Sequence, residues 1–441
     1  MHIKKLLIFV LLGIGNIFFA DTTSSELQLS VQAKKTKKVT IGLITLGSVS
    51  SKLKTCVQRV IKDLEWSGQC LVEQKDLDSL QHEKDLKQLF EPKIAVAIIL
   101  SEEKGNIYTW RLYDLSTVKM IIGKKVEMGH DSINYVAHTI ADQLWPQLFG
   151  TESSFRSKVA YSKQIWRKKH GKEKPYKQIW IADFDGSNAQ LFINTPTISF
   201  APRWSNDPTC PLLFYSENTL SNVQLVMSNM FGKRRVVCSF DGLNMQPTFS
   251  QDGKKIVFCL SKDGTSQLYI SSIDEITGKR HFERLTYNSG QNIAPCFVDK
   301  THVAFASDYK TGKPQIFMLD LKTKSIEQIT DGGYCVCPSY SFVKKQLVYS
   351  KMVGGAMQLF LYDIKTQEHT QLTDSPGSKE EGSWSSCGNY ITFGLNQGMD
   401  SRIAQYHLPT KTMHYLTSKD DNCTYPTCSP IYQENLGILE K

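Results

Sequence analysis

The stretch Gln246–Ile270, QPTFSQDGKKIVFCLSKDGTSQLYI, contains two apolar runs separated by turn residues. It begins with Pro-x-aromatic-Ser, turns at Asp252-Gly253 and then alternates again. Asp-Gly between alternating apolar residues is a strong hairpin signal. One copy of this phrase would predict a single hairpin, whereas a recurring copy would predict a repeat architecture.

The phrase recurs every 43 to 48 residues through the second half of the chain. Three further apolar runs follow within each period, in a fixed order. Four short strands per repeat of this length predict a β-propeller blade. The six anchors are Pro202–Ser205 (PRWS), Pro247–Ser250 (PTFS), Pro295–Val298 (PCFV), Pro338–Ser341 (PSYS), Gly382–Ser385 (GSWS) and Pro426–Ser429 (PTCS).

The two ends of the repeat region are expected to share one blade. Little chain follows Pro426, and three apolar runs precede the first anchor, at Val159–Ser162, Gln178–Ile181 and Gln190–Phe192. Pairing the last anchor with these runs closes a ring of six blades and removes exposed sheet edges. The aromatic residue of each anchor is expected to fill the wedge between blades.

Residues 39–150 lack the period and alternate strand and helix patterns, which predicts a separate α/β domain. The fold class is therefore multidomain, an N-terminal α/β domain followed by an all-β six-bladed propeller over residues 158–430. Expected strands are Val39–Leu46, Ile94–Leu100, Tyr108–Tyr113 and Met120–Glu127, and expected helices are Ser51–Leu64 and Asp131–Phe149.

Residues 1–20 have the layout of a secretory signal, with Lys4-Lys5, an apolar run from Leu6 and a small residue at Ala20. We expect cleavage near Ala20 and a flexible mature segment over residues 21–38. The alternative is a buried or membrane-anchoring N-terminal helix. No later stretch is long and apolar enough to cross a bilayer, so the mature protein is expected to be soluble and exported.

The formal net charge of +9 does not by itself indicate nucleic-acid binding. The two basic clusters, in Lys34–Lys38 and Arg167–Lys174, lack an aromatic stacking pattern and are interpreted as solvated charge. Eleven cysteines, an odd number, cannot all pair within one exported chain. Cys56 and Cys70 could bridge, Cys335 and Cys337 are expected on one strand face, and Cys423 and Cys428 are expected to flank a turn. Most of the cysteines are expected to act as small buried hydrophobic side chains.

The sequence contains no motif that predicts catalysis. Gly-x-Ser-x-Gly, His-Glu-x-x-His and the phosphate-binding glycine motifs are all missing from it. We therefore expect no catalytic residue, no cofactor and no metal site. Gly47–Ser50 is interpreted as a helix cap and Asp183–Asn188 as a turn between strands. The segments before the anchors cross the channel mouth, where loops on a rigid scaffold provide a recognition surface.

These features resemble the TolB family, exported propeller proteins of the Tol–Pal envelope system. The resemblance covers nearly the whole mature chain, and its most specific part is IWIADFDGSNAQ, Ile179–Gln190. It implies a non-enzymatic, monomeric periplasmic adaptor that supports outer-membrane integrity, protein transport and cell division. The chain departs from the family pattern at Gly382, at Cys428, at Asp299-Lys300, where the Asp-Gly turn is missing, and in the longer basic segment Asp21–Lys38.

The resemblance also implies partners and contact residues. The lipoprotein Pal is expected at the channel mouth and TolA at the N-terminal region, with other outer-membrane or peptidoglycan-linked proteins as further partners. The chain would then be peripheral to the membrane through its partners. An accessory propeller of a prolyl-oligopeptidase-like peptidase is the alternative. The family's Pal contacts correspond to Leu243, Gln246 and Ile293, and the expected surface includes their neighbours Asn244, Asn292 and Ala294.

Overall fold

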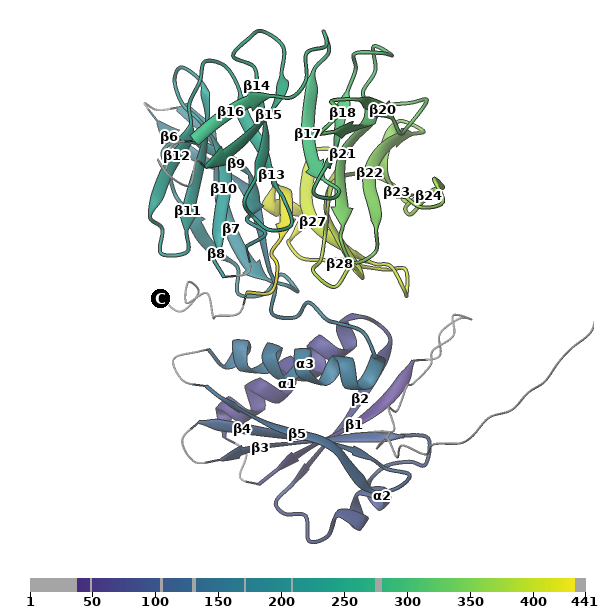
Figure 1. Ribbon diagram of the computed structural model, residues 1–441. Coiled ribbons are helices and arrows are strands. Elements are labelled where there is room, and N and C mark those ends of the chain that lie inside the picture. The colour runs from purple at the N-terminus through teal and green to yellow at the C-terminus, as the bar shows by residue number, and fades with distance from the viewer. Residues whose placement is uncertain are drawn as a thin grey trace, which may run out of the picture.

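The computed structural model describes residues 38–47, 50–103, 106–128, 132–169, 172–207, 209–273 and 280–432. The predicted signal at residues 1–20 and nearly all of the predicted segment 21–38 lie outside the described residues. The chain forms an α/β domain and a six-bladed propeller, which lie one above the other in Figure 1. This confirms the predicted fold class.

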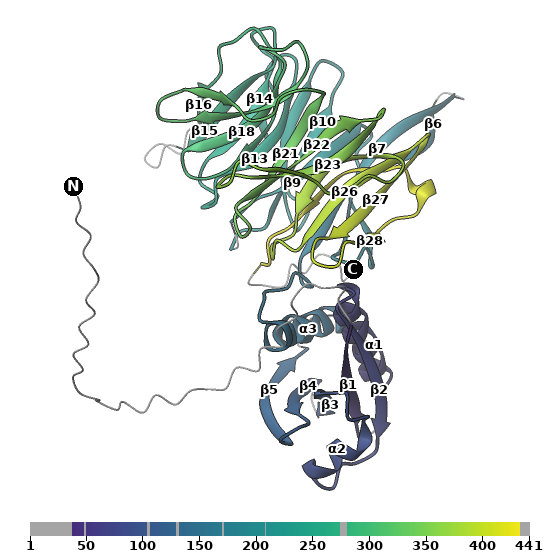
Figure 2. The same ribbon diagram turned by 90° about the vertical axis from the view of Figure 1, so that its right-hand side faces the viewer.

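The α/β domain is built on one five-stranded sheet in the order β2-β1-β3-β4-β5. β1 pairs in parallel with β2 and β3, and the remaining pairs are antiparallel. Helices α1 and α3 cover one face, while the short α2 lies on the other (Figure 2). The elements are β1 (Val39–Leu46), α1 (Ser51–Trp66), β2 (Cys70–Leu77), η1 (Glu83–Asp85), α2 (Leu86–Leu89), β3 (Val96–Glu103), β4 (Ile107–Asp114), β5 (Lys119–Glu127) and α3 (Ile133–Phe149).

Helix α1 begins where its sequence predicts a cap. The Ser50 side chain accepts a hydrogen bond from the backbone N–H of Leu53 at 3.0 Å, which confirms the interpretation of Gly47–Ser50. Apolar residues then recur at helical spacing, and their buried faces pack on the sheet. Sequence patterning missed three elements, β2, η1 and α2. β2 alternates weakly and much of this edge strand is partly exposed, while η1 and α2 are too short to show a helical period.

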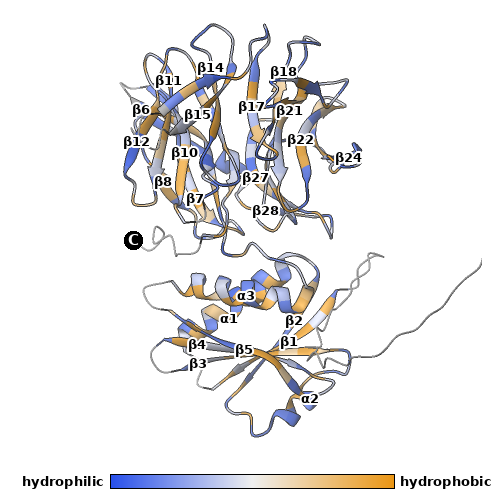
Figure 3. Ribbon diagram, viewed as in Figure 1, coloured by the Kyte–Doolittle hydropathy of each residue, from blue (hydrophilic) through white to orange (hydrophobic). Residues whose placement is uncertain are grey.

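The propeller consists of six four-stranded antiparallel sheets. In Figure 3 apolar segments run along the strands of both domains and the turns are largely polar. The first five blades are β9–β12 (Ile198–Trp204, Leu212–Asn218, Val223–Asn229, Arg234–Cys238), β13–β16 (Asn244–Phe249, Ile256–Leu260, Gln267–Ile273, Arg280–Arg284), β17–β20 (Asn292–Phe297, His302–Ser307, Gln315–Asp320, Ile326–Gln328), β21–β24 (Cys335–Ser341, Gln346–Val353, Ala356–Asp363, His369–Gln371) and β25–β28 (Ser378–Trp384, Tyr390–Gln397, Asp400–His407, Thr412–Tyr415).

The sixth blade joins the two ends of the repeat region, as predicted. Its order is β29-β6-β7-β8, and β29 (Cys423–Cys428) pairs antiparallel with β6 (Lys158–Lys169). β7 (Lys172–Asp183) and β8 (Gln190–Ile193) complete the sheet. The innermost strand of this blade therefore comes from the C-terminal part of the chain, and the ring is closed by backbone hydrogen bonds.

Four of the five anchor aromatics are buried, as predicted, and Tyr340 is partly buried. Trp204 and Trp384 are 4% and 7% exposed. Each indole N–H donates to a backbone carbonyl of the preceding blade, from Trp204 to Thr427 at 3.2 Å and from Trp384 to Ser339 at 3.1 Å. The indoles thus fill volume and satisfy a buried donor at once, which is what a buried tryptophan requires.

The three cysteine placements are wrong, whereas the expectation that most cysteines are small buried side chains is confirmed. All eleven cysteines are free. Cys56 and Cys70 are both buried in the α/β core, where the Cys70 thiol donates to the carbonyl of Leu64 at 3.0 Å. Cys335 is buried and Cys337 lies beyond a shift in strand register, so the two do not share one regular strand face.

Cys423 and Cys428 are the two ends of strand β29 and do not flank a turn. Burial raises the pKa of most of these thiols, to about 12 for Cys56, Cys70 and Cys259, so they remain protonated and act as small apolar side chains.

Candidate partner-binding site at the propeller channel

The wall of the central channel carries one strained residue per blade. Each innermost strand shifts its pairing register once, and the residue immediately before each anchor has a positive φ. A non-glycine residue pays about 1–2 kcal/mol for this conformation. Such bulges bend a strand and re-aim its side chains, and they are common next to functional sites. The six residues are Ala201 (51°), Gln246 (55°), Ala294 (50°), Cys337 (54°), Glu381 (60°) and Tyr425 (57°).

Hydrogen bonds join these bulges to the neighbouring blade. The backbone N–H of Ala294 donates to Gln246 Oε1 at 2.9 Å, and that of Tyr425 donates to Glu381 Oε2 at 2.8 Å. The N–H of Ala201 donates to Ser162 Oγ at 3.2 Å. Three of the six bulges are therefore held by side chains from adjacent blades, which preforms these parts of the channel wall.

Acidic and basic groups meet on one side of this wall. Burial raises the pKa of Glu381 to about 7, although Arg203 and the N–H of Tyr425 favour its charged form. Glu380 and Lys177 lie in the same neighbourhood, and burial lowers the pKa of Lys177. The Glu381 carboxylate therefore titrates near neutral pH, inside the channel.

A cavity of about 340 Å³ occupies the part of the channel that follows the bulges. Its lining runs from the bulges to the turns that lead into the second strand of each blade, including Asn206, Val343 and Ser386. Ser386 Oγ lies 2.9 Å from Ser154 Oγ, in the segment that joins the two domains. This cavity therefore lies at the end of the channel nearer the α/β domain.

The predicted binding residues lie at the bulges and toward the opposite mouth. Gln246 and Ala294 line the cavity, while the others precede the bulges on β13 and β17 or in the turn before β13. Leu243 is exposed, at 39%, and Ile293 is half-buried between two blades. The structure thus brings the six predicted residues onto two adjacent blades.

Asn244 and Asn292 are buried and have a structural role. The Asn244 amide donates to the carbonyls of Val223 and Phe240, at 2.8 and 2.7 Å. The Asn292 amide donates to Gln267 Oε1 at 3.0 Å and to Asn288 Oδ1 at 2.8 Å. Both residues fix the loops that precede β13 and β17 at the channel mouth distal to the α/β domain, which we call the distal rim. Leu243, by contrast, presents its side chain at the surface of this rim.

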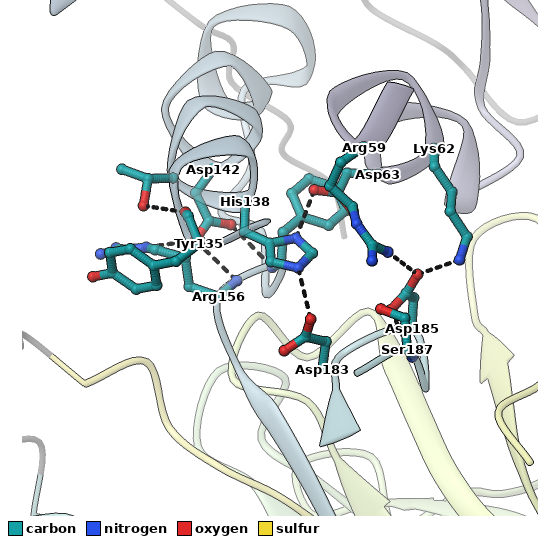
Figure 4. Close-up of polar contacts among 12 residues, drawn as sticks. Arg59, Lys62, Asp63, Tyr135, His138, Asp142, Arg156, Asp183, Asp185 and Ser187 are labelled. Atoms are coloured by element: carbon teal, nitrogen blue, oxygen red, sulfur yellow. Dashed lines mark hydrogen bonds and ion pairs between the residues drawn. The ribbon is translucent and has the colours of Figure 1, made fainter. Parts of the chain in front are cut away.

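A buried ionic cluster joins the two domains, on the side of the propeller that faces the α/β domain (Figure 4). His138 on α3 lies between Asp63 on α1, at 2.7 Å from Nδ1, and Asp183 at the end of β7, at 3.3 Å from Nε2. Lys158 on β6 also contacts Asp183, at 2.6 Å. We call His138, Asp63, Asp183 and Lys158 the interdomain cluster.

The interdomain cluster keeps its histidine charged. Burial alone would lower the pKa of His138, but the two carboxylates outweigh burial and raise it to about 10. Burial would raise the pKa of Asp183, but His138 and Lys158 hold that pKa well below its usual range. The cluster is therefore a set of paired buried charges, which are costly to break by removing one partner.

The turn after β7 makes a second contact with α1. Asp185, whose side chain is almost fully buried, accepts from Arg59 at 2.7 Å and from Lys62 at 2.5 Å (Figure 4). Ser187 donates its backbone N–H to the same carboxylate at 3.0 Å, as expected of a tight turn. The turn prediction for Asp183–Asn188 is confirmed, and its interdomain role is new.

The C-terminal end of α1 completes the interface. The Trp66 indole donates to Gln405 Oε1 at 2.8 Å and stacks on His414 with ring centroids 4.2 Å apart. Thr410 donates to the carbonyl of Ser67 at 3.0 Å. Sequence patterning missed these contacts because each joins single residues more than 300 positions apart in the chain.

Among the residues that the structure describes, no group of three or more His, Cys, Asp or Glu side chains is placed to hold a metal ion. Within the same ranges, no helix combines the length and the apolar character needed to span a bilayer.

Comparisons with known proteins match both the repeat region and the whole architecture. The family model described as the TolB beta propeller domain matches residues 145–432. The chain is 31% identical over 157 residues to the Tol-Pal system protein TolB of Histophilus somni, covering 34% of this chain and 35% of that protein. It is 28% identical over 236 residues to TolB of Francisella tularensis subsp. mediasiatica, covering 49% and 51%.

The matched segments thus span between about a third and half the length of these curated relatives. Among solved structures, TolB from Acinetobacter baumannii aligns with a TM-score of 0.75 at 20% identity, covering 89% of this chain and 97% of that one. At this identity the structural likeness shows a shared fold, including the α/β domain.

Proposed function

Because the chain belongs to the TolB β-propeller family, we propose that it is a non-enzymatic periplasmic adaptor of the Tol–Pal system. In this function the mouth of the propeller channel distal to the α/β domain binds Pal. The N-terminal region, including residues 21–38, contacts TolA. The protein would then couple outer membrane and peptidoglycan to an energised inner-membrane partner, and so support envelope integrity and division.

The observation that carries this proposal is the preformed rim on two adjacent blades. Asn244 and Asn292 hold its loops from within, and exposed Leu243 provides an apolar contact at its surface. A rigid rim lowers the entropy cost of binding, because few side chains must be ordered on association. A few buried apolar contacts then provide most of the affinity, and polar loop groups provide specificity.

Binding of purified Pal to the wild-type protein and to two charge-insertion variants tests the proposal. Leu243→Glu places a charge on the distal rim, and we expect it to weaken Pal binding about tenfold or more. Val343→Glu is the matched control, since Val343 is 62% exposed and lies at the cavity end of the channel. Equal affinities for Leu243→Glu and the wild type would contradict the proposed site.

Two further measurements test the other parts of the proposal. Removal of residues 21–37 is expected to abolish TolA binding and to leave Pal binding intact. Retained TolA binding would contradict the N-terminal contact. Turnover of peptide or ester substrates by the purified wild-type protein would contradict the non-enzymatic assignment.

A further inference from the structure

The hairpin β6–β7 extends well beyond the blade to which it belongs. The two strands pair over their full length, from Lys158 opposite Asp183 to Lys169 opposite Lys172. Their neighbours stop earlier, since β29 reaches only Lys163 and β8 only Ile179. Figure 2 shows β6 projecting past the other strands. The outer part of the hairpin is therefore a two-stranded ribbon whose edges pair with no other strand in the described residues.

This ribbon concentrates positive charge. Between residues 163 and 177 the sequence has seven lysines and arginines and one glutamate. Arg167 lies opposite Lys174 and Lys169 opposite Lys172, and only Lys168 lies opposite the glutamate, Glu173. Like charges directly opposite one another destabilise a strand pair. The ribbon thus holds its cations in an arrangement that strand pairing alone disfavours.

Most of these cations have no internal counter-ion. Of the ribbon cations whose side chains the structure describes, only Lys163 forms an ion pair, with Asp421 at 2.5 Å. Arg167 lies over the Tyr176 ring, 5.6 Å from its centroid, and donates to Asn194. The side chains of Lys168, Lys172 and Lys174 are exposed. The ribbon therefore presents uncompensated positive charge to its surroundings.

An exposed aromatic residue accompanies this charge. Trp166 is 58% exposed, although most tryptophans in the two domains are buried or half-buried. It lies opposite Pro175 and shares its strand face with Lys168 and with Glu173, which lies opposite Lys168, whereas Arg167, Lys172 and Lys174 belong to the other face of the same narrow ribbon. An indole beside lysines is the combination found where proteins meet the headgroup region of a bilayer, since the ring is amphipathic and lysine stems can lie along apolar surface.

The shape of the ribbon favours a flat partner. It is a projecting hairpin, and neither the channel cavity nor the small cavity beside Lys158 extends along it. An acidic peptide would be bound best by a groove, whereas a protruding ribbon can reach a surface. The pair Lys169 and Lys172 ends the described ribbon at the opposite end of β7 from Asp183, so the ribbon extends away from the α/β domain and toward the same side as the distal rim.

We propose that the β6–β7 ribbon docks the protein on bilayers that contain anionic phospholipid. The lysines and Arg167 approach the negative headgroups, and Trp166 inserts at the interface. Each cation near such a surface contributes by attraction that falls off within a Debye length, so binding weakens as salt is raised. This inference does not depend on Pal or TolA binding, and it adds a membrane contact to the proposed adaptor.

Sedimentation with vesicles of phosphatidylcholine, with and without phosphatidylglycerol, tests the ribbon. The variant Lys168→Glu/Lys172→Glu/Lys174→Glu is expected to lose about a hundredfold in partitioning onto anionic vesicles, and Trp166→Ser several-fold. Because these residues lie outside the blade cores, thermal unfolding should be unchanged. The matched control reverses three exposed lysines elsewhere on the propeller, Lys254→Glu/Lys322→Glu/Lys365→Glu, and is expected to bind like the wild type.

Several results would overturn the inference. These are wild-type binding that is absent or independent of phosphatidylglycerol, an equal loss in the control variant, or loss of binding when residues 21–37 are removed. Binding to poly-glutamate that matches vesicle binding and does not depend on Trp166 would instead indicate an acidic polypeptide partner. Pal binding by the ribbon variants is expected to stay intact, so failure here is distinguishable from failure of the proposed function.

Discussion

Replacing His138 by glutamine should loosen the contact between the two domains. His138 bonds Asp63 at 2.7 Å and Asp183 at 3.3 Å, and all three side chains are at most 3% exposed. Glutamine keeps much of the volume but removes the positive charge, which leaves Asp63 buried beside an uncharged partner. Removing one member of a buried ion pair costs about 3–5 kcal/mol.

Calorimetry of the purified protein measures this cost, with His302→Ala as the control. His302 pairs with Asp299 at 2.8 Å on the surface, where such pairs contribute about 0–1 kcal/mol. We expect a clearly lower unfolding temperature for His138→Gln. We also expect faster proteolysis of Thr151–Ser157, the segment that connects α3 to β6. A loss no larger than that of the control would refute the reasoning.

The stability lost on replacing His138 by glutamine should decrease as pH rises. The pKa of His138 is raised from 6.5 to about 10 in the folded protein. Its stabilising contribution is therefore complete below about pH 6.5 and declines as pH rises toward 10. The difference in stability between wild type and His138→Gln should shrink over that window, and a difference that grows with pH would contradict the assignment.

Three further outcomes follow from the propeller itself. Trp204→Ala should lower the free energy of unfolding by about 3–5 kcal/mol in denaturant titration, while Trp166→Ala should change it by less than about 0.5 kcal/mol. Truncation before Cys423 removes β29 and should lower the melting temperature strongly, because the sixth blade loses its inner strand; an unchanged melting temperature would contradict the closure. Glu381→Gln should be neutral near pH 4 and stabilising above pH 7, since burial raises the pKa of Glu381 from 4.5 to about 7 and its ionisation then opposes folding. Equal pH dependence in both proteins would contradict that last prediction.

The propeller could be predicted from the sequence because its signal repeats. One Pro-x-aromatic-Ser phrase is ambiguous, but six such anchors at nearly constant spacing predict six blades. The three apolar runs that precede the first anchor, beginning at Val159, predict that the two ends of the repeat region share one blade. The bulges before the anchors could not be predicted, since the six residues that adopt positive φ share no chemistry. Ala201, Cys337 and Tyr425 are placed there by the ladder around them.

Other features depended on contacts that a linear reading cannot supply. Cys56 and Cys70 were expected close enough to bridge, yet packing buries both as thiols. His138 gave no signal alone, because its partners lie 75 and 45 residues away in sequence. Arg167–Lys174 was interpreted as solvated charge in a loop, whereas the paired ribbon aligns those cations on opposite strands.

Hydrogen exchange on the wild-type protein, with and without Pal, tests the central claim most directly. The account predicts new protection of backbone amides around Leu243 and Ile293, on the rim distal to the α/β domain. Amides at the cavity end, around Val343 and Ser386, should exchange as in the free protein. Protection confined to the cavity end, or none on the propeller at all, would contradict it.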